Sequence, residues 1–144
     1  MWERLQADAF MEVKQAVVWA PTLVSADSSA HSLGVVLLQN NRPVEFIAKS
    51  LTDTQQRYSQ IEKELLAILF AVKRFRYYLF GKEKILVETD HQPLIGLMAK
   101  PISELSPRLA QMRLELLSYP VLLELKHKPG ADMILADVPS STCP

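Results

Sequence analysis

The feature that most constrains the fold is an uninterrupted apolar run, ILV at residues 85–87, which leads directly into ETDH at residues 88–91. A strand with one solvent-facing side alternates apolar and polar residues, whereas a strand covered on both faces is continuously apolar. Covered strands of this kind lie in the middle of sheets that have helices packed against them. The run therefore predicts a central strand of an α/β domain, and this strand ends in a carboxylate and an imidazole.

The rest of the chain alternates between helical and strand periodicity. Apolar residues recur at helical spacing in residues 8–20, 53–80 and 105–119, and strand patterns cover residues 22–27, 32–39, 42–51, 84–89 and 121–130. A terminal helical segment is predicted to begin at residues 131–137. Asn40-Asn41 tolerates the positive φ angles of a tight hairpin, and a short turn contains Pro93. A meander of three strands followed by β-α-β crossovers predicts a mixed sheet flanked by helices, which is the α/β class.

Composition narrows the classes of function. The 144 residues suffice for one domain, and 16 basic and 16 acidic side chains give zero net charge, which counts against a stand-alone nucleic-acid binder. The basic clusters at residues 73–76 and 126–128 are compatible with phosphate contacts and equally with a solvated face. The single Cys143 excludes a disulfide framework or a thiolate metal site within one chain. Without a membrane-length apolar run or a signal-peptide pattern, an intracellular setting is expected.

Four acids stand out by position. Asp27 ends the first strand, Asp90 ends the central strand, and Asp137 lies in the C-terminal segment. On the long helix, Glu64 falls about 60° from the centre of the apolar stripe, at the edge of the buried face, and Lys63 is predicted to face solvent.

Taken alone, each acid is explained as simply by a helix cap, a strand end or a surface charge. If the four converge, their mutual repulsion requires protons or hard cations, and oxygen ligands suit Mg²⁺ or Mn²⁺. Spacing by itself does not decide between these explanations.

Several blocks of the sequence, in this order, are similar to one known module. The blocks are ADSSAHSLGVVLLQ, RPVEFIAKSLTDTQQRYSQIEKELLAILFAVKRFRYYLFG, VETDHQPL, SPRLAQMRLELLSYPV and HKPGADMILAD. They resemble the ribonuclease H domain that follows reverse transcriptase in gypsy-type long-terminal-repeat retrotransposon polyproteins. The resemblance covers residues 21–137 and implies a ribonuclease H-like domain over residues 21–144, with residues 1–20 ending the connection segment. It implies a mixed five-stranded sheet of order 3-2-1-4-5.

The resemblance also implies an activity, which is cleavage of the RNA strand of an RNA–DNA hybrid. Two Mg²⁺ ions, or Mn²⁺ in their place, would be held by Asp27, Glu64, Asp90 and Asp137. Asp27 would bridge both ions, Glu64 and Asp90 would complete one site, and Asp137 the other. His91 is a candidate substrate contact, although it could equally fix the turn before the following proline by hydrogen bonding. The implied partners are the hybrid and the polymerase portion of the same polyprotein, in the cytoplasm or a virus-like particle.

A second hypothesis is a structural or tethering module that keeps the fold without the activity, as in a decayed or recruited retroelement. Three features favour this alternative. The net charge is zero, and fewer residues lead into the first strand than the similar module usually has. In addition, Pro139 would interrupt a helix that continues through Asp137. The joint presence of Asp27, Glu64 and Asp90 favours the enzyme.

Overall fold

The structure, a computed structural model, describes residues 22–79 and 81–129. Its strands are β1 (Thr22–Ser28), β2 (Ser32–Gln39), β3 (Arg42–Ser50), β4 (Lys84–Thr89) and β5 (Leu122–His127). Its helices are α2 (Asp53–Gln56), α3 (Gln60–Arg74), α4 (Arg76–Leu79), α5 (Gln92–Met98) and α6 (Pro107–Leu117), with a 3₁₀ turn at Ile102–Glu104. Several predictions lie outside the described residues. They are the helix at residues 8–20, the boundary of the connection segment, the terminal helical segment at residues 131–137 and the role of Asp137 within it.

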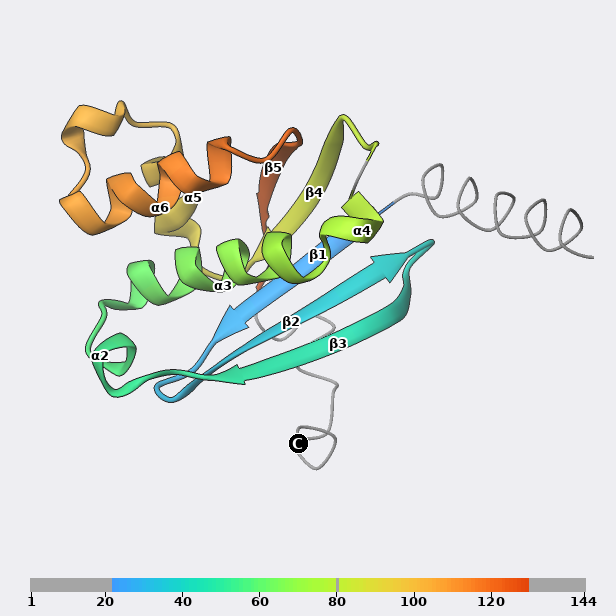
Figure 1. The fold of residues 1–144 in the computed structure, drawn as a ribbon, viewed down its shortest axis with the longest axis horizontal. Helices are drawn as coiled ribbons and strands as arrows, with labels where there is room; N and C mark the ends of the chain where they lie inside the picture. Colours follow the sequence, from blue (N-terminus) through green and yellow to red (C-terminus); the bar gives the residue numbers. More distant parts are fainter. Residues whose placement is uncertain (1–21, 80, 130–144) are drawn as a thin grey trace, which may run out of the picture.

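The five strands form one mixed sheet in the order β3-β2-β1-β4-β5, which confirms the predicted α/β class and strand order. β1 pairs antiparallel with β2 and β2 with β3, whereas β1, β4 and β5 are mutually parallel along the sheet. Figure 1 shows α3 lying across one face of this sheet, with α5 and α6 toward the β4–β5 side. The continuously apolar run at residues 85–87 lies in β4, and this strand is flanked by a strand on each side.

The hairpin between β2 and β3 forms where the sequence predicts it. Gln39 pairs with Arg42, so the loop consists of Asn40 and Asn41 alone. Both residues have positive φ, 55° and 63°, as the primed two-residue turns that match strand twist require. Asparagine adopts this conformation at less cost than most residues, and this explains the pair.

The main core lies between α3 and the sheet. The predicted apolar stripe is buried from Leu65 onward, with Leu65, Ile68 and Phe75 each at most 1% exposed. Ile61, at its start, is half-buried. The helix predicted as continuous is divided at Phe75, which caps α3 before the short α4 begins. Gly81 follows with φ of 85°, a left-handed conformation that suits glycine and ends the helical segment as predicted.

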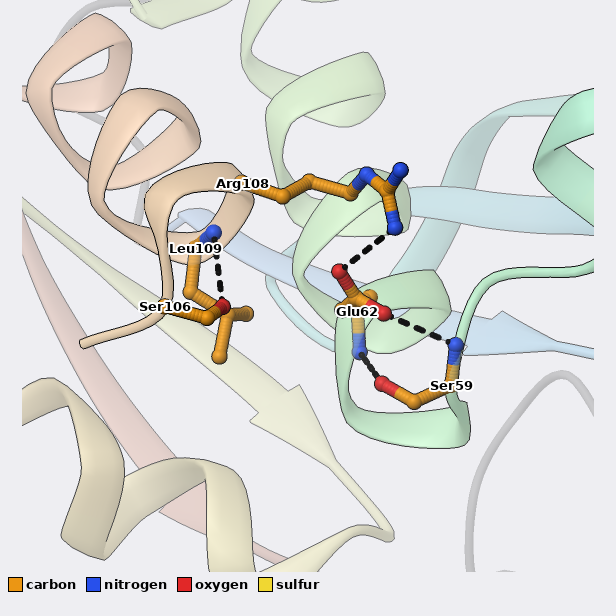
Figure 2. A network of polar contacts seen from close by, with 5 residues as sticks. All are labelled: Ser59, Glu62, Ser106, Arg108 and Leu109. Atoms are coloured by element: carbon orange, nitrogen blue, oxygen red, sulfur yellow. Dashed lines mark hydrogen bonds and ion pairs between the residues drawn. The ribbon is translucent and has the colours of Figure 1, made fainter.

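The first turn of α3 is fixed by a capping box and by a contact from α6. The Ser59 hydroxyl accepts a hydrogen bond from the Glu62 amide, and the Glu62 carboxylate accepts one from the Ser59 amide. Arg108 of α6 donates to the second Glu62 oxygen at 3.1 Å, and its guanidinium lies 4.1 Å from the centre of the Tyr58 ring. Figure 2 shows this link between the two helices. It holds the helix end from which Glu64 projects.

Replacing Arg108 by alanine should lower the free energy of unfolding by about 1 kcal/mol, since it removes a charge-assisted hydrogen bond and a cation–π contact together. Urea unfolding measures the change. Lys84→Ala is the matched control, because the Lys84–Glu124 pair is more than half exposed at both ends and such pairs contribute little. Equal losses from the two variants would contradict a special role for the α3–α6 link.

Two local predictions are wrong. The segment containing Pro93 is not only a turn, because Pro93 sits in the first turn of α5, where its missing amide proton leaves no hydrogen bond unmade. Lys63 does not face solvent; it is 8% exposed, and its ammonium lies 3.4 Å from the carbonyl oxygen of Ala30 in the β1–β2 loop. Among the described residues, no helix has the length and apolarity that crossing a membrane requires.

Candidate metal centre

Two aspartates lie at the same edge of the sheet because parallel strands in register carry them there. Asp27 is the last but one residue of β1, and Asp90 directly follows β4. Ser25 pairs with Glu88 in the parallel ladder, so two further residues along each strand bring Asp27 opposite Asp90. This is the carboxyl end of both strands, where α/β sheets commonly bind ligands.

Glu64 joins the two aspartates from the second turn of α3. The residue is only 2% exposed, which agrees with its predicted place at the border of the apolar stripe. One carboxylate oxygen each from Asp27, Glu64 and Asp90 lie within 4.8 Å of one another, and Asp90 is the most exposed of the three. The structure therefore brings together three of the four acids singled out in the sequence.

The two oxygens of Glu64 have different surroundings. Oε1 accepts hydrogen bonds from the Ser28 hydroxyl at 2.7 Å and from the Gln60 side-chain amide at 2.8 Å, and the same amide donates to Ser28 at 3.0 Å. Oε2 is buried and has no hydrogen-bond partner among the described residues. A buried carboxylate oxygen without a donor is costly, so a positive ligand or a proton is expected at Oε2.

The cluster resists full ionisation. Burial raises the pKa of Glu64 to about 7; hydrogen bonds from Ser28 and Gln60 oppose this rise, while the charges of Asp27 and Asp90 add to it. Burial, followed by the charge of Asp90, likewise raises the pKa of Asp27, against a hydrogen bond from the Ser28 amide. Two carboxylates 4.8 Å apart repel by about 3.5 kcal/mol at an effective dielectric of 20.

This arrangement suits a hard divalent cation. The donor set consists of carboxylate oxygens without sulfur or imidazole, which matches the preference of Mg²⁺ and Mn²⁺. Mg²⁺ binds oxygens at about 2.1 Å, so oxygens that share one ion lie at most about 4.2 Å apart, and a side-chain movement of about 0.6 Å brings oxygens at the 4.8 Å limit within that range. The acids fit the ion on charge, donor type and spacing, and the bare Oε2 of Glu64 is the oxygen best placed to bind it.

The remaining sequence candidates have different outcomes. Asp137 lies outside the described residues, so its predicted role as a fourth ligand stays a prediction. His91 is half-buried at the N-cap position of α5, where its side chain makes no capping hydrogen bond. The turn is held instead by the Thr89 hydroxyl, which accepts from the His91 amide at 3.2 Å. The imidazole is therefore not what fixes this turn.

Sequence reasoning missed Ser28 and Gln60, the two residues that hold Glu64. Gln60 carried a readable signal, because residues four apart on a helix share a face and Gln60 precedes Glu64 by four. Ser28 carried none, since its role depends on how α3 lies against the end of β1.

Comparisons with known proteins identify a family. Residues 18–119 match the family described as RNase H-like domain found in reverse transcriptase. The chain is 36% identical over 140 residues to the retrovirus-related Pol polyprotein from transposon 297 of Drosophila melanogaster. This alignment covers 90% of the chain and 13% of the polyprotein. The chain is 40% identical over 74 residues to the Pol polyprotein from transposon gypsy of the same organism, covering 51% of this chain and 7% of the polyprotein.

Solved structures show the same fold. The structure of LC11-RNase H1 in complex with RNA/DNA hybrid aligns with a TM-score of 0.60 and 14% sequence identity, over 81% of this chain and 91% of that one. The chain spans about an eighth of the length of the transposon 297 polyprotein but 91% of the LC11-RNase H1 chain.

Proposed function

This chain belongs to the family of RNase H-like domains found in reverse transcriptase, and we propose that it cleaves the RNA strand of RNA–DNA hybrids within a retrotransposon polyprotein. The observation that carries the proposal is the convergence of Asp27, Glu64 and Asp90 within 4.8 Å, with one buried Glu64 oxygen left without a donor. An intracellular setting, in the cytoplasm or in a virus-like particle, is part of the same proposal.

The proposed assignment gives each acid a role at two Mg²⁺ or Mn²⁺ ions. Asp27 would contribute to both ion sites, Glu64 and Asp90 would complete one site, and Asp137 would complete the other. Bound ions of this kind activate a water for in-line attack on a phosphodiester and stabilise the leaving oxygen. The chain's own contribution is to hold the acids fixed: β1 and β4 place the aspartates in register, and α3 buries Glu64 with one oxygen anchored.

Substrate choice is proposed to rest on backbone shape and 2′-hydroxyl groups rather than on base sequence, as is usual for recognition of A-like duplexes. His91, next to Asp90 and with no capping role for its side chain, stays a candidate substrate contact. The polymerase portion of the polyprotein is the proposed source of most of the affinity for hybrid, because this chain has no net positive charge.

The test is a cleavage assay with an RNA–DNA hybrid labelled on each strand in turn, in Mg²⁺ or Mn²⁺. The expected result is cut RNA, intact DNA, no cutting of single-stranded RNA, and full inhibition by a chelator. No cleavage by this chain, even when it is joined to its polymerase portion, would favour the structural or tethering module. Calorimetry with Mn²⁺ separates the two in the same way, because a tether has no reason to bind two ions.

The geometry favours the enzyme over the tether. Three carboxylates held within 4.8 Å repel one another, and a module that only connects domains gains nothing from that cost. Replacing any one of the three acids by a neutral residue would relieve this repulsion.

Replacing Ser28 by alanine should weaken metal binding about tenfold, because groups that orient a ligand typically contribute this much. The change removes one of the two hydrogen bonds that fix Glu64 Oε1. Calorimetric titration with Mn²⁺ measures it, and Ser28→Thr, which keeps the hydroxyl, should restore most of the affinity. Gln111→Ala, an exposed change on α6, is the control. Unchanged affinity in Ser28→Ala would mean that burial alone orients Glu64.

A further inference from the structure

Three consecutive cationic or titratable residues end β5 beside the acidic cluster. Lys126 and His127 are exposed, and Lys128 follows directly. In the parallel ladder Glu88 pairs with Lys126 and Thr89 with His127, and the Lys128 amide donates to the Thr89 carbonyl at 2.9 Å. The next pair along this register is Lys128 and Asp90. Since neighbouring strands lie about 4.8 Å apart, the basic segment borders the metal centre.

Lys126 and Lys128 point to the same face of the sheet, since side chains two residues apart on a strand share a face. Glu88, the register partner of Lys126, occupies that face on β4. The Lys128 ammonium lies 3.5 Å from Glu88 Oε1, and the Glu88 side chain is 8% exposed while that of Lys128 is 36% exposed. The buried acid therefore pairs with a lysine whose side chain stays partly exposed, and the three donors of its ammonium leave capacity for a phosphate oxygen.

Lys126 makes no ion pair among the described residues. The lysine nearest the start of β4, by contrast, is engaged: Lys84 pairs with Glu124 at 2.8 Å. On β4 and β5, the lysine without an ion pair among the described residues thus lies at the carboxyl end of the strands, where the acids lie.

The other basic cluster in the sequence, residues 73–76, has a different position and different partners. It ends α3 ten residues after Glu64, which corresponds to about 15 Å along the helix. Lys73 pairs with Glu115 at 2.6 Å, and the Arg74 guanidinium lies over the Phe70 ring at 5.8 Å. These contacts engage Lys73 and Arg74 within the domain.

We propose that Lys126 and Lys128 form a phosphate-binding rim that holds the sugar–phosphate backbone of the hybrid beside the metal centre. The inference rests on the proposed function and adds to it the residues that bind the substrate backbone. The rim offsets the negative field of the acids, and Glu88 lowers the entropy that Lys128 loses on binding by restraining its flexible stem beforehand.

The test compares two double variants that remove the same charge. Lys126→Gln/Lys128→Gln and Lys73→Gln/Arg74→Gln each lower the net charge by two, and both are made in an Asp27→Asn background so that hybrid is bound without being cut. Fluorescence anisotropy with a labelled hybrid gives the affinity over a series of salt concentrations, and thermal unfolding confirms that each variant is folded. The rim variant should bind at least about tenfold more weakly at low salt, with a salt-dependence slope reduced by about 1.5, because each phosphate contact contributes about 0.7 to 0.9.

The Lys73→Gln/Arg74→Gln variant should bind hybrid with the affinity of its parent. Equal weakening in both variants would mean that only net charge matters, and no weakening in the rim variant would also overturn the inference. With Asp27 intact, the rim variant should raise KM more than it lowers kcat. If the parent chain cuts hybrid but the two double variants bind it equally well, the phosphate-binding rim is rejected and the proposed function stands. If the parent chain neither binds nor cuts hybrid, both the rim and the proposed function are rejected.

Discussion

Asp27→Asn should reduce cleavage of the RNA strand by at least about 10³-fold, which corresponds to about 4 kcal/mol of lost transition-state stabilisation. In the proposed site Asp27 is the acid shared by both ions, so its loss affects both at once. The amide that replaces it keeps an oxygen to accept the hydrogen bond from the Ser28 amide, and the local backbone should be unchanged. Initial rates of hybrid cleavage at saturating Mg²⁺ measure the loss.

The same substitution should not destabilise the fold. Burial and the charge of Asp90 both raise the pKa of Asp27, so the ionised form is disfavoured in the folded chain and a neutral amide relieves this repulsion. Urea unfolding without divalent ions should give Asp27→Asn a free energy of unfolding equal to or above that of the parent. A rate loss with undiminished stability separates a ligand from a structural residue.

Asp53→Asn is the matched control, because it makes the same chemical change at an exposed position in the first turn of α2. It should cut hybrid at the parental rate. Asp90→Asn should behave like Asp27→Asn. If the Asp27, Asp90 and Asp53 variants all cleaved hybrid at the rate of the parent chain, the acids at the sheet edge would have no part in the mechanism.

How much the sequence could predict depends on whether a feature is local or set by packing. The central strand was readable because continuous apolarity has one simple explanation, and the hairpin was readable because Asn40-Asn41 tolerates positive φ. The edge at which Asp27 and Asp90 meet follows from strand direction alone. Helical periodicity placed Glu64 at the border of the buried face, where the structure has it.

What the sequence could not predict depends on segments that approach one another from far apart. Periodicity places Lys63 on the solvent side of α3, but the loop after β1 covers that side and accepts its ammonium. Ser28 likewise forms hydrogen bonds with Glu64 and Gln60, which lie more than 30 positions away, because α3 packs against the end of β1. Periodicity describes a helix in isolation, so it fails wherever another segment packs against the polar face.

The stability of the chain without metal should fall as the pH rises from about 4.5 to about 7. Burial raises the pKa of Glu64 from its ordinary value of 4.5 to about 7, so between these values the folded state holds a proton that the unfolded state has released. The free energy of unfolding decreases with pH wherever the folded state binds more protons. A shift of this size corresponds to about 3 kcal/mol, and the raised pKa of Asp27 acts in the same direction.

Denaturant unfolding at pH 5 and pH 8 measures this difference, and Glu64→Gln is the control. The glutamine keeps an oxygen that can accept from Ser28 and Gln60 but carries no titrating proton, so the variant should lose most of the pH dependence.

Saturating Mg²⁺ should act on the parent in the opposite sense. Because the ion binds the ionised carboxylates, it stabilises the folded chain more at pH 8 than at pH 5 and should reduce or reverse the slope. Glu64→Gln should gain far less from Mg²⁺. A parent chain whose pH dependence is the same with and without Mg²⁺ would show that these acids, although close together, do not share a cation.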